Sequence, residues 1–490
     1  MPKKLLAPLI SAILAATAFA AAPAQASKTQ ESIFQDDRTL IFSGDAKRQA
    51  ALDEMKALGA TTIHSLVFWN SIAPNPNSKT KPAGFDGSNP NAYPAGAWDQ
   101  YDALVKEATA RGLQVLFSPV EAPAWAGACG NTNLRHHCRP DPAEFGAFVT
   151  ALGKRYSGSF GGLPRVSRWS VWNEPNQSNW LYPQRQKVHG HIIPTAAVIY
   201  RNLFRAATAA LQATGHGGDQ ILLGETAPLG RTTGSLPKRF LTPVQLYQGV
   251  FCLDSHGRKL RGQIAKDSGC SGKYAPLAAT GVAHHPYNRG GSQPPLSRPA
   301  AGEITISTLS RLTGVLAQGS RAGRIAKSLP IYLTEFGFQT NPPDTIFGVS
   351  LARQALWLNQ SDYIAYRNSR VKSVSQYELL DEPDLSVFQS GLRFVNGKDK
   401  PSLAAYRLPV WVTRHGSGVR VWGQVRPADG TAQQVVIQNG NRAFKDVQTV
   451  TTTPDGYFQV NVARQPGPKW RLSWKSPDGT TYTSRLATAS

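Results

Sequence analysis

The sequence predicts an α/β fold, a closed (β/α)8 TIM barrel followed by a small C-terminal antiparallel β-sandwich domain. From about residue 32 to residue 406, short β-branched and apolar runs alternate with amphipathic helical stretches, which is typical of a parallel sheet with crossover helices. The runs number eight, the count that a closed barrel requires. After residue 406 the segments become short and alternating, with turn signals such as Asp429-Gly430 and Asn439-Gly440 between them.

The eight expected strands are the short apolar runs themselves. They cover residues 40–43, 63–68, 113–118, 166–172, 221–224, 282–285, 331–334 and 371–377. An open doubly wound sheet is the alternative, but it would carry a Gly-rich phosphate-binding turn after its first strand, and the sequence has none there. The closed barrel is therefore the predicted architecture.

The helices between the strands are predicted from the spacing of apolar residues. Positions i, i+3, i+4 and i+7 lie on one face of a helix, which can then pack on a sheet. Stripes with this helical spacing are Tyr101, Leu104, Val105 and Ala108; Phe145, Phe148, Val149 and Leu152; and Leu309, Leu312 and Leu316.

The N-terminus resembles a secretory signal peptide. Lys3 and Lys4 precede an apolar run, and Ala24 and Ala26 form a small-residue exit, so cleavage is expected before Ser27. An uncleaved membrane anchor is the competing interpretation. We expect a signal peptide at 1–26, a catalytic barrel at 27–405 and a β-sandwich domain at 406–490, with the mature protein secreted or periplasmic.

The four cysteines form two close pairs in polar, Gly-rich segments. Cys129 and Cys138 are one pair, and Cys252 and Cys270 are the other. In an exported protein, this spacing favours two local disulfides. A zinc site that uses His136 and His137 is the alternative, although the separated ligand clusters typical of zinc sites are missing.

The formal net charge of +22 indicates attraction to polyanions. The basic residues are scattered and accompany no nucleic-acid-binding motif, so we expect no nucleic-acid partner. A glycan that carries uronate or phosphate groups fits an exported protein better. A generally basic surface without a partner is the alternative.

Two of the predicted strands end in a glutamate. Glu174 stands in Asn173-Glu174-Pro175 after the fourth strand, and Glu335 precedes Phe336-Gly337 after the seventh. Active residues of barrels lie at the carboxyl ends of strands, and a converging carboxylate pair is what cleavage of a glycosidic bond needs. The structural alternative for each glutamate is a solvated carboxylate or an ion pair with an arginine.

These motifs resemble those of clan A glycoside hydrolases, in which the Asn-Glu-Pro glutamate is the acid/base and the seventh-strand glutamate the nucleophile. Pro123-Ala124-Trp125-Ala126 and Trp180 make the sequence most similar to family 39, with family 5 close behind. The resemblance covers the barrel and not the C-terminal domain. It implies a retaining hydrolase with Glu174 as acid/base and Glu335 as nucleophile.

The resemblance also implies roles in substrate binding. Asn173 corresponds to the side chain that bonds the sugar 2-hydroxyl, and His285 and Tyr287 to residues that orient the nucleophile and the sugar. The candidate stacking platforms for sugar rings are Trp69, Trp125 and Trp180. Burial in the core is the alternative for each of these aromatic and histidine side chains.

The sequence departs from the clan pattern at two positions. His64 stands on the second strand where many members carry an arginine that supports the nucleophile, and it is counted among the candidate substrate-binding residues. Tyr377 ends the eighth strand where other members place a tryptophan under the sugar, and it is the candidate replacement for that tryptophan in substrate binding. Glu121 and Glu225 also end strands, where each either contacts substrate or pairs with an arginine.

We therefore predict a monomeric retaining glycosidase that needs no cofactor or metal and does not bind a membrane. Its expected substrate is an extracellular polysaccharide or oligosaccharide, with anionic glycans among the candidates. A catalytically silent glycan-binding protein and a transglycosylase are the alternatives. The sugar, the linkage and endo or exo action stay open.

Overall fold

The computed structural model describes residues 27, 29–129 and 132–490. The predicted signal peptide at 1–26 lies outside the described residues. Within the described part of the chain, no helix is long and apolar enough to cross a membrane.

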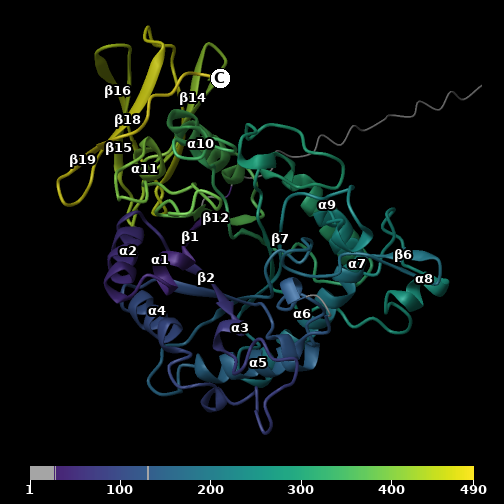
Figure 1. The fold of residues 1–490 in the computed structure, drawn as a ribbon. Coiled ribbons are helices and arrows are strands. Elements are labelled where there is room, and N and C mark those ends of the chain that lie inside the picture. Colours follow the sequence, from purple (N-terminus) through teal and green to yellow (C-terminus); the bar gives the residue numbers. More distant parts are fainter. Residues whose placement is uncertain (1–26, 28, 130–131) are drawn as a thin grey trace, which may run out of the picture.

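The predicted barrel is confirmed: eight parallel strands close into a ring (Figure 1). The ring closes because β1 pairs with both β12 and β2. In ring order from β1, the strands are β1 (Glu31–Gln35), β12 (Val371–Tyr377), β9 (Ile331–Leu333), β8 (Gly281–His284), β7 (Gln220–Thr226), β4 (Arg168–Ser170), β3 (Gln114–Val120) and β2 (Thr62–Phe68).

Helices surround the ring, as Figure 1 shows. The main ones are α2 (Asp45–Ala57), α4 (Asp99–Ala110), α5 (Pro142–Arg155), α6 (Thr195–Ala213), α7 (Pro243–Val250), α9 (Leu309–Arg321) and α10 (Leu351–Tyr366). Shorter elements of the barrel are α1 (Asp37–Ile41), α3 (Trp69–Ile72), α8 (Gly262–Asp267), α11 (Pro401–Arg407), the hairpin β5 (Gln186–Val188) and β6 (His191–Ile193), and the pair β10 (Thr340–Asn341) and β11 (Val349–Ser350). The apolar stripes predicted for α4, α5 and α9 are buried, as expected.

The first predicted strand is wrong. Residues 40 and 41 belong to α1, and β1 precedes them in the sequence. The Asp36 side chain accepts a hydrogen bond from the Thr39 backbone N–H (3.0 Å) and caps the start of α1. Leu40 and Ile41 are buried on a helix, because a short apolar run packs equally well in either conformation.

The C-terminal segment forms two antiparallel sheets that share one core, as a β-sandwich does. One sheet has the order β13 (Val410–His415), β14 (Gly418–Gln424), β17 (Tyr457–Val462), and the other has the order β16 (Phe444–Thr451), β15 (Gln434–Gly440), β18 (Lys469–Lys475), β19 (Thr481–Thr483). Trp470 and Trp474 are buried in this core. The predicted β-sandwich is confirmed.

The sandwich packs on α10 of the barrel. Trp422 is 1% exposed and contacts Tyr363 and Tyr366 of α10. An ion pair joins Arg426 to Asp362 (3.4 Å) inside this contact. Trp422 is therefore part of the packing between barrel and sandwich rather than an exposed surface for sugar.

Disulfide bonds join Cys129 to Cys138 and Cys252 to Cys270. The paired Cα atoms lie 5.5 and 5.6 Å apart, within the usual range for disulfides. The thiols are consequently not available as zinc ligands. The second disulfide closes the segment that contains α8.

Candidate active site

A cleft of about 960 Å³ opens at the carboxyl ends of the barrel strands. It is lined by residues at the ends of β1, β2 and β12 and by the segments that follow β1, β4, β7, β8, β9 and β12. Among the residues predicted from the sequence, those on its wall are Asn173, Glu174, Trp180, Tyr287, Glu335 and Tyr377. The cleft therefore lies where barrel enzymes place their active sites.

Glu174 is held by an unusual turn after β4. Trp172 and Glu174 have positive φ angles of 66° and 38°, a conformation that non-glycine residues adopt at a cost of about 1–3 kcal/mol. The Glu174 backbone N–H donates to the Glu225 carbonyl (2.9 Å). The Gln177 side-chain amide donates to Oε2 of Glu174 (2.8 Å). These contacts fix the direction of the carboxylate.

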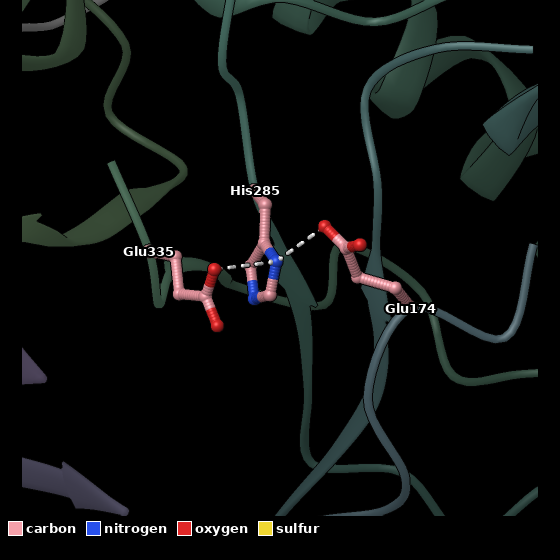
Figure 2. Close-up of side chains that lie close together, drawn as sticks. All are labelled: Glu174, His285 and Glu335. Atoms are coloured by element: carbon pink, nitrogen blue, oxygen red, sulfur yellow. Dashed lines mark hydrogen bonds and ion pairs between the residues drawn. The ribbon is translucent and has the colours of Figure 1, made fainter. Parts of the chain in front are cut away.

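His285 lies between the two predicted catalytic carboxylates (Figure 2). Its Nδ1 is 3.0 Å from Oε1 of Glu174 and 3.3 Å from Oε2 of Glu335. An oxygen of each glutamate and the imidazole nitrogen all lie within 4.8 Å of one another. The two glutamates, 161 positions apart in the printed sequence, thus meet at one buried nitrogen.

Burial and neighbouring charges shift the pKa values of His285 and Glu335. Burial lowers the pKa of His285, but the charge of Glu335 and the hydrogen bond with Glu174 outweigh it and raise this pKa to about 9. Burial raises the pKa of Glu335 to about 7, against the opposing effect of the His285 charge. At neutral pH His285 is thus a cation beside the carboxylates, a short distance beneath the cleft.

A second buried histidine, His64, contacts Glu225 and the residue before Glu335. His64 is fully buried, with Nε2 2.8 Å from Ser118 Oγ and 3.0 Å from Glu225 Oε1. Its Nδ1 is 3.3 Å from the carbonyl oxygen of Thr334, the residue before Glu335. Burial lowers the pKa of His64, but the carboxylates of Glu225, Glu335 and Asp37 together more than offset this effect and raise the pKa. The positive charge of His64 in turn lowers the pKa of Glu335.

Aromatic side chains line the cleft beside Glu335. The Tyr287 hydroxyl donates to Oε2 of Glu335 (3.3 Å). Phe388, from the segment after β12, stacks on Tyr287 with 28° between the ring planes and meets Tyr377 edge-on. Phe388 is 41% exposed and lines the cleft, so part of its ring is open to a ligand.

Three predictions of direct substrate contact need correction. Trp69 is 1% exposed and stacks on Phe148 in the core, because its place at the start of α3 points it toward α5. His64 is buried in the network below the cleft. Trp125 lines a different cavity, with its indole N–H bonded to the Pro74 carbonyl (3.0 Å). None of these three lines the catalytic cleft.

Several residues of the site were not predicted. Gln177, which bonds Glu174, lies three positions after it in the same turn, a spacing that could have drawn attention to it. Arg38 and Glu382 form an ion pair (3.1 Å) on the cleft wall, far apart in sequence and without a recognisable motif. Phe388 lies in a long connection whose path only the fold reveals.

Glu174, His285 and Glu335 are also close enough to be considered as metal ligands. A histidine binds a metal through a deprotonated nitrogen. With its pKa raised to about 9, His285 is an imidazolium cation at neutral pH, with a proton on both ring nitrogens and no free nitrogen for a metal. The chemistry of this trio therefore fits a shared proton between two carboxylates better than a metal ion.

No family model matches the sequence, and no curated protein matches it. Solved structures with a similar fold include a GH30 endoxylanase from Clostridium papyrosolvens C71, with 10% identity and a TM-score of 0.47 over 91% of this chain and 96% of that chain. A GH5_18 protein from Streptomyces cattleya has 16% identity and a TM-score of 0.46 over 78% of this chain and 79% of its own. A family 30 subfamily 8 xylanase from Clostridium acetobutylicum has 12% identity and a TM-score of 0.45, over 91% and 96%. Membership of family 39 stays a prediction.

Proposed function

We propose that this protein is a retaining glycoside hydrolase that acts on an exported or extracellular glycan. The proposal rests on the proximity of Glu174 and Glu335, which both contact His285. One carboxylate oxygen of Glu174 lies within 4.8 Å of one of Glu335. Retaining enzymes hold their two carboxyl groups about 5–5.5 Å apart, whereas inverting enzymes leave about 6.5–9.5 Å for a water molecule. The close approach favours retention.

In the proposed first step, Glu335 attacks the anomeric carbon while Glu174 gives its proton to the departing glycosidic oxygen. The C–O bond to the leaving group breaks, and an ester bond forms between the sugar and Glu335. In the second step Glu174 takes a proton from water, which displaces Glu335 from the sugar. Two carboxylates suffice for both steps, so the proposal includes no cofactor.

His285 connects the two carboxylates in this scheme. Its Nδ1 carries one proton, which can be shared between Glu174 and Glu335. When the ester forms and Glu335 loses its negative charge, this proton stays on His285 and is donated in a hydrogen bond to Glu174, which is then the carboxylate that takes a proton from water. The Tyr287 hydroxyl, which donates to Glu335, holds the attacking oxygen in place. Asn173 lines the cleft next to Glu174 and is the proposed partner of the sugar 2-hydroxyl.

Export is part of the proposal. The N-terminal sequence has the pattern of a signal peptide. The two disulfides are compatible with an oxidising compartment outside the cytosol. We therefore place the substrate among the glycans outside the cytoplasmic membrane.

The stereochemistry of the product tests the mechanism. The mature protein is first screened against neutral and acidic polysaccharides and a set of aryl glycosides to find a substrate. Proton NMR of the fresh hydrolysate should then show the anomer with the substrate's configuration before mutarotation sets in. Initial appearance of the opposite anomer would make the mechanism inverting and remove the nucleophile role of Glu335.

The pH dependence of the first step gives a second prediction. With an aryl glycoside whose leaving group needs no protonation, kcat/KM should rise as the pH passes through about 7, because Glu335 must be ionised to attack. Replacing His285 with glutamine removes a neighbouring positive charge and should move this rise to higher pH. Rate profiles from about pH 3 to about pH 9 measure both, since this range includes the ordinary glutamate pKa. A wild-type midpoint near the ordinary glutamate pKa of about 4.3 would contradict the prediction.

A further inference from the structure

A second cavity, which we call the flank pocket, lies between α8 and the C-terminal end of α9. Its volume is about 700 Å³, and its cationic lining residues are Lys259, Arg261, Lys266, Lys273 and Arg324. No acidic side chain is among its lining residues in the described part of the chain. Figure 1 places α8 on the outer side of the ring of helices. The flank pocket and the catalytic cleft share no lining residue.

The charges of the flank pocket are not neutralised by the protein. None of its five cationic side chains forms an ion pair with another described residue. The carboxylates nearest in sequence are already engaged: Asp254 pairs with Arg258 (2.8 Å), and Asp267 accepts a hydrogen bond from His189 (2.8 Å). Like charges that face one cavity repel one another, so an anion that enters the pocket gains from all of them.

The walls of the flank pocket are held rigidly. The Cys252–Cys270 disulfide closes the segment that carries most of the cations. Buried Arg201 donates to the backbone carbonyls of Gly249 (3.1 Å) and Ser268 (2.6 Å), which ties that segment to α7. The Tyr274 hydroxyl donates to the Val250 carbonyl (2.8 Å). The backbone around the pocket is therefore tied in place, and a ligand would have to order only the exposed lysine and arginine side chains.

The pattern of charges indicates the class of ligand. The five cations come from two parts of the chain, residues 259–273 and residue 324, and they border one cavity. A linear polymer with repeated negative charges can engage several of them at once. Tyr274, the one aromatic side chain among the described residues that line the pocket, lies against the guanidinium groups of Arg324 (4.1 Å) and Arg205 (4.8 Å). Because both guanidinium groups lie over the Tyr274 ring, this ring is not available to stack on a nucleic-acid base.

We propose that the flank pocket binds an acidic polysaccharide and holds the protein on that polymer at a distance from the catalytic cleft. The excess positive charge of the whole chain acts in the same direction, because it draws polyanions toward the protein. The proposal does not depend on the proposed catalytic function. A protein that binds acidic glycans at its flank could have either an active or an inactive cleft.

The test measures binding by isothermal titration calorimetry at about 50 mM NaCl, where attraction between charges is little screened. The ligands are polygalacturonate, neutral pullulan and double-stranded DNA. All proteins carry Glu335→Gln, so that cleavage does not disturb the titration. The pocket variant is Lys259→Glu with Lys273→Glu, and a milder variant is Arg324→Gln. The control, Arg442→Glu with Lys445→Glu, changes the net charge equally on the exposed surface of the sandwich domain.

The pocket variant should bind polygalacturonate at least tenfold more weakly, and Arg324→Gln several-fold more weakly, with unchanged melting temperatures. The control should change this affinity less than twofold, and pullulan should not bind. Equal losses in the pocket and control variants would mean that only net charge matters and would overturn the proposal. It would also be overturned if polygalacturonate fails to bind, or if DNA binds more tightly than polygalacturonate and loses affinity selectively in the pocket variant.

Discussion

Replacing Glu335 with alanine is expected to lower kcat/KM by at least about 10⁴-fold on every substrate, because no glycosyl ester can form without the nucleophile. Leaving-group acidity should not rescue this variant, since the missing group acts on the sugar and not on the departing oxygen. Added azide can enter the space of the missing carboxylate and attack the anomeric carbon directly. The product should be a glycosyl azide of inverted configuration, identified by NMR.

The control for this variant is Glu121→Gln. Glu121 also follows a barrel strand, but it does not line the cleft. Its replacement should leave kcat/KM within about twofold of the wild-type value, after correction for any loss of folded protein. If Glu335→Ala keeps wild-type activity on the natural polysaccharide, the active site lies elsewhere on the molecule.

Replacing Glu174 with alanine should give a different pattern. Activity on the natural polysaccharide should fall by about 10²–10⁴-fold, the usual contribution of a general acid or base. An aryl glycoside with an acidic leaving group needs little protonation, so its first step should survive. The glycosyl ester on Glu335 should then accumulate, because no base activates water. The leaving group should be released in an initial burst, and mass spectrometry should detect the added mass of the sugar on the protein.

Azide separates the two roles. It needs no general base, so it should restore turnover of the Glu174→Ala variant and give a glycosyl azide of retained configuration. A retained azide product from the Glu335 variant, with no rescue of the Glu174 variant, would reverse the two assignments.

The barrel and the two glutamates could be predicted because their signals are local in the sequence. Each glutamate lies shortly after an apolar strand, and parallel strands of a barrel bring their carboxyl ends to one face. The contacts that shift the pKa of Glu335 could not be predicted in the same way. His285 was expected at the site, but its position between both carboxylates depends on the register of β8 with β7 and β9.

The wrong predictions for Trp69, for His64 and for the strand at residues 40–43 have a common physical cause. A tryptophan or histidine next to a strand end has the same sequence signal whether it faces the cleft or the core. Trp69 faces Phe148, and His64 faces Glu225, so both became part of the interior. The prediction of a strand at residues 40–43 is wrong for a similar reason, because a run of two or three apolar residues does not distinguish a helix from a strand.

Helix α10 illustrates how the attached sandwich restricts sequence change in the barrel. In a barrel without such a domain, the outer face of this helix would meet water and could accept most polar residues. Here Tyr363 and Tyr366 lie under Trp422, and Asp362 is matched to Arg426. A polar replacement of either tyrosine would bury a group without a partner, and loss of Asp362 would leave a buried cation. Over evolutionary time, substitutions on α10 are therefore expected to occur together with substitutions in β14 and its neighbours rather than with those around the cleft.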